Sequence, residues 1–404
     1  MERTAGADFE APGRATDAGA GDQTDVSGIT LSQAHWRSYL PEYLLRRLAS
    51  APPQAEPESR ELEAVLLLSD IQGFSGLVQG AVEQGRVGLE ALAMQLNAYF
   101  SGLAEIVLSE GGDVLSVAGD AFLCLFLPAA GEPTVAGAAQ RAARAALRVQ
   151  QALADGGMPT RIGVACGPLA LGQVGGHGQR WDLVLGGPAL ERVVVAERAC
   201  PPGGVRLCPG CEALLAPVAR LQAPGLLLAL DDGAPPAPHA PAPAIDPERL
   251  RPYVPAIVLQ RELITDKAWM AEFRNVSVML ASLPPLLPSD PLSLSQLHAG
   301  IGAFQRVLAR YQGTLKVDAD DKGLLLLGVF GLPTRSHEDN AGRAVRCALE
   351  LVAALREAGL PGAVAVTTGR AFCGVFGNHL RREYMMRGDV VNLASRLSLL
   401  RESE

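Results

Sequence analysis

Apolar positions along the chain alternate between short continuous runs and longer stretches with helical spacing. Residues 64–69 form a Val/Leu-rich run with the length of a buried strand. Over residues 88–110 the apolar side chains recur every three or four positions and a Gly-Gly pair follows, which predicts a helix and its end. The runs 114–117 and 121–127 flank a turn and predict a hairpin.

The alternation continues with a predicted helix over 135–155 and a predicted strand over 161–165. This order of elements predicts an α+β fold built from a ferredoxin-like βαββαβ unit. In such a unit we expect the helices to cover one face of a mainly antiparallel sheet.

The two halves of the chain repeat each other. Three glycines of the first half recur 202 positions later: Gly167, Gly175 and Gly186. The echoed segments are 36–47 with 251–261, 64–69 with 276–281, 111–128 with 312–333, 161–167 with 363–369, and 182–186 with 384–388. Five echoes in the same order indicate a duplicated unit rather than chance similarity.

The repeat and the composition together predict four parts. Residues 1–33 are rich in Gly, Ala, Asp and Thr and are expected to be disordered. Residues 34–230 form the first predicted domain. A Pro/Ala-rich linker spans 231–249, and residues 250–404 form the second domain.

Charge and hydropathy exclude several classes of partner. The net charge is -8 and no basic block occurs, which argues against a nucleic-acid partner. No run reaches the roughly 18 apolar residues of a membrane span, and the N-terminus does not resemble a secretory signal. The 7 cysteines have irregular spacing, so a reducing cytoplasm is the expected location.

One cysteine pair, Cys208 and Cys211, has the CxxC spacing of metal and redox motifs. Zinc usually takes four protein ligands in structural sites, and the sequence shows no second pair of cysteines or histidines to complete the set. We therefore expect two thiols in a surface loop rather than a metal or redox site.

Two aspartates occupy positions that suit a metal site. Asp70 ends the first predicted strand, and Asp120 sits at the tip of the hairpin. If strand and hairpin are neighbours, the two carboxylates converge and offer the hard oxygen ligands that Mg²⁺ takes beside phosphates. The amides near Gly73 could then contact phosphate oxygens at a helix start. Turn and cap positions for both aspartates are the alternative.

Several motifs resemble those of the class III nucleotidyl cyclases. "LLLSDIQGFSGL" and "GGDVLSVAGDAFLCLF" are similar to the two metal motifs of that family. "DDKGLLLLGVFGLP", "CGVFGNHLRREY" and "GDVVNLASRLS" look like the tandem soluble adenylyl cyclases, the bicarbonate-responsive family and its bacterial relatives. The resemblance covers about residues 35–400 and implies two cyclase-homology domains that form an intramolecular pseudodimer.

The resemblance implies a site for ATP that both halves build. In the first half, two Mg²⁺ ions (with Mn²⁺ as a substitute) are expected on Asp70, Asp120 and the Ile71 carbonyl. The loop expected to contact the triphosphate comprises Ile71, Gln72, Gly73, Phe74 and Ser75. Arg161 matches a family lysine near the phosphates.

In the second half, Lys316 matches the lysine that contacts the adenine edge, and Met386 lies in the segment that meets the nucleotide. Asn392 is expected to orient the ribose, and Arg396 to stabilise charge on the phosphate while the 3'-hydroxyl attacks. The implied activity is adenylate cyclase, which converts ATP to 3',5'-cyclic AMP and diphosphate. Without the resemblance, an exposed lysine, a helix-side amide and a surface arginine would be the simpler interpretation.

The sequence also departs from the family pattern. Ala281-Ser282 replaces Ser69-Asp70 in the second copy, so one metal site is expected rather than two. Met385 stands where a threonine helps to hold adenine, and a thioether is a poor hydrogen-bonding group. A catalytically inactive nucleotide-binding or regulatory module and a guanylate cyclase therefore remain alternatives.

Two expectations concern regulation and length. Ser116 and Val193 stand at the positions where bicarbonate-responsive relatives carry cations, so we expect weak bicarbonate activation or none. The second domain is expected to be incomplete at Glu404, with additional C-terminal domains missing from this chain.

Overall fold

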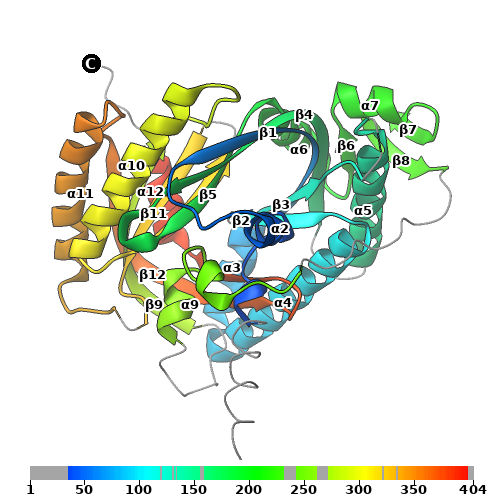
Figure 1. Ribbon diagram of the computed structural model, residues 1–404. Helices are drawn as coiled ribbons and strands as arrows, with labels where there is room; N and C mark the ends of the chain where they lie inside the picture. Colours follow the sequence, from blue (N-terminus) through cyan, green and yellow to red (C-terminus); the bar gives the residue numbers. More distant parts are fainter. Residues whose placement is uncertain are drawn as a thin grey trace, which may run out of the picture.

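The computed structural model of the chain, shown in Figure 1, contains two β-sheets with helices packed around them. It describes residues 35–118, 121–129, 132, 134–154, 159–231, 243–261, 272–320, 323–333 and 335–398. The predicted disordered segment, most of the predicted linker and Asp120 lie outside the described residues. The fold is a mixed α+β fold, as the order of elements predicted.

The first sheet has the strand order β2-β3-β1-β4-β6-β8-β7, with β5 paired to β4. Its strands are β1 Glu58–Ile71, β2 Asp113–Ala118, β3 Ala121–Phe126, β4 Thr160–Gly175, β5 Trp181–Gly186, β6 Val205–Leu207, β7 Ala219–Ala223 and β8 Leu226–Leu230. Among the described pairings only β4 with β6 is parallel, which fits the predicted antiparallel sheet.

The second sheet has the order β10-β11-β9-β12-β13. Its strands are β9 Glu272–Leu283, β10 Thr314–Asp320, β11 Gly323–Phe330, β12 Val364–Gly377 and β13 Arg382–Arg387. This order repeats β2-β3-β1-β4-β5 of the first sheet strand for strand. The duplication inferred from the sequence thus reappears as a duplicated strand order.

The helices follow the same duplication. They are α2 Glu42–Ser50, α3 Phe74–Glu83, α4 Gly85–Ser109, α5 Ala136–Ala154, α6 Pro188–Arg198, α7 Pro209–Leu215, α8 Pro247–Leu250, α9 Ala256–Arg261, α10 Pro291–Arg310, α11 Asn340–Glu357 and α12 Asp389–Ser398. By position, α10, α11 and α12 correspond to α4, α5 and α6. In Figure 1, α10 and α11 lie at one end of the molecule, and α7 with β6–β8 at the other.

The observed elements extend beyond several predicted ones. The strand predicted over 64–69 is the mostly buried centre of β1, where the side chains of Ala64 to Leu67 are 0% exposed. Its polar start from Glu58 pairs with the far end of β4. Polar residues can also form a strand when their backbone groups pair with a neighbouring strand. The apolar run in the sequence therefore predicts that a strand exists but not where it begins and ends. The α8 helix likewise begins at Pro247, inside the predicted linker.

The two halves pack reciprocally. Helix α4 of the first half contacts β12 of the second, and α10 of the second half contacts β4 of the first. Phe372 and Phe376 of β12 belong to the core formed around α4. Ala170 and Val174 of β4 belong to the core formed around α10. Each half therefore completes a hydrophobic core of the other. This packing, rather than the linker, holds the two sheets in contact.

Helix α4 also accounts for an apolar stretch. Within the described residues, the segment Glu90–Ser109 is the one helix long and apolar enough, by length and composition, to cross a membrane. Its inner face carries Leu96, Phe100 and Leu103, all buried in the core shared with β12. Packing inside the molecule therefore explains the composition of this helix.

The prediction for the CxxC pair was wrong. Cys208 and Cys211 are buried, not in a surface loop, because α7 packs against β4. Cys166 of β4 lies beside them. The sequence did not show this third cysteine as a neighbour, since only the fold brings β4 to the CxxC turn.

The contact between the halves predicts an effect on stability at Gly186. A Cβ atom added there would lie 2.0 Å from the carbonyl oxygen of Leu286, which belongs to the other half. We expect Gly186→Ala to lower the free energy of unfolding by about 1–3 kcal/mol, as overpacking does. Thermal or denaturant unfolding measures the change.

Gly102→Ala is the matched control, because a Cβ atom at this position of α4 meets no atom within 4 Å. It should leave stability unchanged or raise it by about 0.5–1 kcal/mol, the usual gain of Ala over Gly in a helix. Equal unfolding midpoints for the wild type and Gly186→Ala would contradict the described packing of Leu286.

Candidate active site

A polar cleft lies between α3 of the first half and the second sheet. It has a volume of about 750 Å³, within the usual range for small-molecule sites. Its lining residues are Phe74, Val78, Phe273, Lys316, Asp318, Leu327, Thr368, Gly369, Arg370, Met386, Arg387, Gly388, Asp389, Val390, Val391, Asn392, Leu393 and Arg396. Both halves contribute to this list.

The structure brings the predicted second-half residues together. Lys316 of β10, Met386 of β13, and Asn392 and Arg396 of α12 all line the cleft. Asn392 and Arg396 lie one helical turn apart on α12 and line the same cleft, as their spacing predicted, and both are exposed. Their roles in binding or catalysis stay predictions, since the structure contains no nucleotide.

The start of α12 is fixed to the second sheet by its backbone. Thr367 of β12 donates its hydroxyl to the carbonyl of Val390 at 2.7 Å. Gly388, just before the helix, has a φ of +152°. A Cβ atom on Gly388 would lie 2.7 Å from the carbonyl oxygen of Arg370. A glycine is therefore needed where the helix starts beside β12, and this contact sets the direction of Asn392 and Arg396.

Lys316 is held by groups from both halves. Its ammonium donates to the carbonyl of Val117 in β2 at 2.6 Å. Carboxylate oxygens of Asp318 and Glu383 lie 3.4 Å and 3.8 Å from the same nitrogen. Burial raises the pKa of the Glu383 carboxyl, and the nearby Lys316 partly offsets that rise. The lysine therefore sits at the junction of the two halves, close to β2, the hairpin strand that precedes Asp120.

The first-half candidates lie at the end of β1. Asp70 pairs with Ala121 of β3 on one side and with Arg161 of β4 on the other. The strand and the hairpin are therefore neighbours, as the metal-site hypothesis required. Asp120 precedes Ala121 but lies outside the described residues, so its carboxylate is not placed. Neither Asp70 nor Arg161 lines the cleft.

The loop after Asp70 reaches the cleft through Phe74. The amide of Gln72 donates to the carbonyl of Pro159 at 2.8 Å, which fixes the loop to the residues before β4. Gly73 has a φ of +71°, and α3 begins at Phe74. Ile71 is buried beneath the loop, and nothing is described for the side chain of Ser75.

Met385 does not line the cleft. It is 5% exposed and packs with Ile71, Tyr99 and Phe100 of the first half. Met386, its neighbour on β13, is the methionine that faces the cleft. The position flagged as a weak adenine contact is therefore a core position under the metal-motif loop.

Two cleft cations were missed from the sequence. Arg387 lies over the ring of Phe74, with its guanidinium carbon 4.9 Å from the ring centroid. Arg370 lies over Phe273 at 5.1 Å. Each stands beside a glycine of the 202-residue repeat, Gly388 and Gly369, whereas the first copy has Leu185 and Pro168 at the equivalent positions. A search for positions that are charged in the second copy and uncharged in the first would have found both arginines.

The mirror position of the cleft is filled. A Cβ atom on Gly186 would lie 2.0 Å from the carbonyl oxygen of Leu286, and one on Gly187 would lie 3.1 Å from the ring of Pro288. Leu286 itself is 0% exposed. At the positions equivalent to Asn392 and Arg396 the first copy has two apolar residues, Leu190 and Val194. The loss of carboxylates in the second copy is thus accompanied by apolar packing.

A second, smaller cavity of about 170 Å³ lies behind Lys316. The repeat-related residues Tyr39 and Tyr253 both line it, together with Ser116. Val193, the other position considered for bicarbonate, is 0% exposed in the first core. The weak response to bicarbonate stays a prediction.

No protein-family model matches the chain. It is similar to adenylate cyclase type 10 of Mus musculus, with 27% identity over 395 residues that cover 85% of this chain and 24% of the mouse protein. The human protein of the same name is 24% identical, over 83% of this chain and 24% of its own length. The chain thus spans about a quarter of the curated relatives it matches.

A solved structure shares the fold over most of the chain. It is a class III adenylyl cyclase-like ATP-binding protein from Pseudomonas aeruginosa, with a TM-score of 0.58 and 12% sequence identity. The match covers 85% of this chain and 82% of that one. In sequence the chain is therefore similar to soluble adenylate cyclases, and in fold to a class III adenylyl cyclase-like protein.

Proposed function

We propose that the chain is an adenylate cyclase that converts ATP to 3',5'-cyclic AMP and diphosphate in the cytoplasm. One observation carries the proposal: a single cleft joins Phe74, from the loop after Asp70, with Lys316, Asn392 and Arg396. These residues come from both copies of the repeat. The named relatives are adenylate cyclases, but they are about four times as long as the matched region, so the activity is proposed from the cleft.

The charges of the cleft favour a nucleoside triphosphate. Its lining contains four cations, namely Lys316, Arg370, Arg387 and Arg396, against the two carboxylates of Asp318 and Asp389. Arginine binds phosphate oxygens through paired, charge-assisted hydrogen bonds. The excess of positive charge in the cleft thus suits the phosphates, and apolar residues such as Met386 and Leu327 suit a base.

We further propose that residues 34–230 and 250–404 are two cyclase-homology domains that form an intramolecular pseudodimer. Support comes from the repeated strand order and the reciprocal packing of α4 and α10. In this arrangement one cleft is active and the filled mirror position is not. The second domain supplies Lys316 toward the base, Asn392 toward the ribose and Arg396 toward the phosphate.

The end of β1 fits the divalent metal that the resemblance implies. Asp70 offers carboxylate oxygens, which suit a hard divalent cation, and its strand lies beside the hairpin strand β3. Asp70, Asp120 and the Ile71 carbonyl would hold the Mg²⁺ ions, which neutralise phosphate charge and activate an oxygen nucleophile. The loop through Gly73 then positions the triphosphate between these residues and Arg396.

The reaction is intramolecular, so the residues of the cleft mainly position the ATP and stabilise charge on its phosphates. Asn392 holds the ribose so that the 3'-hydroxyl faces the α-phosphorus. Arg396 stabilises the charge that develops on the phosphate during attack. A correctly placed donor toward developing charge is commonly worth about 10²–10³-fold in rate.

We expect Arg396→Ala to lower kcat for cyclic AMP formation by about 10²–10³-fold while KM for ATP changes little, because the lost contact acts on developing charge. Asn392→Ala should lower kcat as well, through misplacement of the ribose. Steady-state assays with ATP and Mg²⁺ or Mn²⁺ measure both. Arg306→Ala is the matched control, since Arg306 is an exposed arginine of α10 outside the cleft.

Other results of these assays would distinguish the adenylate cyclase from the alternative functions. Equal turnover by Arg396→Ala and the control would contradict the proposed mechanism. ATP binding without cyclic AMP from the wild type would indicate an inactive nucleotide-binding module. A clear preference for GTP would indicate a guanylate cyclase.

A second prediction concerns the metal. Removing divalent cations with a chelator should abolish turnover, and added Mg²⁺ or Mn²⁺ should restore it. Asp70→Asn should require far more metal for half-maximal rate, because an amide binds a hard cation less tightly than a carboxylate. Asp231→Asn, at an exposed aspartate whose side chain is 58% accessible, should behave as the wild type. Identical metal dependence in the two variants would remove Asp70 from the metal site.

A further inference from the structure

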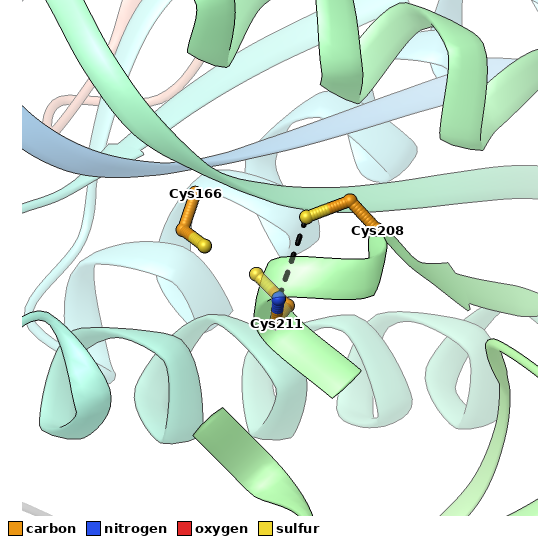
Figure 2. Close-up of side chains that lie close together, drawn as sticks. All are labelled: Cys166, Cys208 and Cys211. Atoms are coloured by element: carbon orange, nitrogen blue, oxygen red, sulfur yellow. Dashed lines mark hydrogen bonds between the residues drawn. The ribbon is translucent and has the colours of Figure 1, made fainter. Parts of the chain in front are cut away.

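Three cysteines converge where the arm β6–α7–β7–β8 joins β4. Figure 2 shows Cys166 of β4 directed toward Cys208, the N-cap of α7, and Cys211 in the first turn of that helix. The three sulfur atoms all lie within 4.8 Å of one another. The side chains are 7%, 4% and 0% exposed, in the order of their numbers. The arm that brings the CxxC pair to β4 has no counterpart in the described second half.

The backbone brings these thiols together through specific contacts. The amide of Cys208 donates to the carbonyl of Val164 on β4 at 2.8 Å. The amide of Cys211 donates to the sulfur of Cys208 at 3.4 Å. Gly210 lies between them, and a Cβ atom there would be 2.8 Å from the sulfur of Cys166. A glycine in the CxxC turn is therefore what lets Cys166 approach the pair.

Buried cysteines often act only as small apolar side chains. The chain provides its own comparison, because its other four cysteines, Cys124, Cys200, Cys347 and Cys373, are buried too. Among the described residues none of those four belongs to a group of three potential ligands. Three sulfurs facing one another thus set this site apart from ordinary core packing.

The sulfur spacing suits a metal ion. A zinc–sulfur bond is about 2.3 Å long, so three sulfurs around one ion lie about 4 Å apart. Arg192 donates to the carbonyl of Cys166 at 2.9 Å, which places a positive charge beside the thiols. Thiolates select soft cations such as Zn²⁺ and Cu⁺ over Mg²⁺.

We propose that Cys166, Cys208 and Cys211 bind one thiophilic d¹⁰ cation, Zn²⁺ or Cu⁺, as a three-sulfur site that fastens α7 to β4. Among the described residues no histidine or carboxylate joins the three thiols. Cu⁺ is satisfied by three sulfurs, whereas Zn²⁺ takes water as a fourth ligand, as in open zinc sites. Binding releases thiol protons and stabilises the fold, because the unfolded chain lacks the preformed site.

The test uses the full chain, reduced and stripped of metal, in separate titrations with Zn²⁺ and Cu⁺ against a chelator of known affinity. We expect one equivalent of cation to bind and to raise the unfolding temperature. We expect each single cysteine variant to bind the cation at least about tenfold more weakly: Cys166→Ser, Cys208→Ser and Cys211→Ser. Losing a residue that only supports a metal ligand already costs about 10–100-fold in affinity, so losing a ligand itself should cost no less. Cys200→Ser, at a buried cysteine outside the site, is the matched control.

X-ray absorption on the metal-loaded wild type counts the ligands directly and does not depend on any variant folding. In the Cu⁺-loaded chain we expect three sulfur ligands alone, and in the Zn²⁺-loaded chain three sulfurs with one lighter atom. Either result supports the site. Binding of neither cation at one equivalent, unchanged affinity in Cys166→Ser, or fewer than three sulfurs would overturn the proposal. So would a Cys208–Cys211 disulfide that persists in reductant and excludes metal.

Discussion

The reciprocal packing of the two halves is the constraint on which the rest of the structure depends. Helix α4 closes a core on β12, and α10 closes a core on β4. Because each helix covers a strand of the other half, the two sheets keep a fixed relation. The cleft exists only in that relation, since Phe74 comes from one half while Lys316 and Arg396 come from the other.

The same packing makes the mirror position differ from the cleft. In the second copy, Leu286 and Pro288 fill the space beside Gly186 and Gly187. Around the open cleft the equivalent positions are charged, as in Arg370 and Arg387. The two positions therefore differ: one is packed with apolar groups and the other has charges suited to phosphates. The three-cysteine site lies on an arm found in the first half alone among the described strands.

The sequence predicted much of this fold from local patterns. The hairpin and helices α4 and α5 follow the expected periods, and the repeat predicted that the strand order would recur. The ends of β1 were missed because polar residues there are held by pairing with β4. Lys316, Asn392 and Arg396 could be named through the resemblance, whereas Arg387 and Cys166 depend on convergence in space. Periodicity contains no information about which distant strand brings a thiol or a guanidinium into contact.

The most direct measurement of the central claim is a crystal structure of the chain with a non-cyclisable ATP analogue and a divalent cation. We expect one nucleotide per chain, with its triphosphate between the Gly73 loop and Arg396 and its base near Lys316. A nucleotide bound beside Leu190 at the filled mirror position, or held by one half alone, would contradict it.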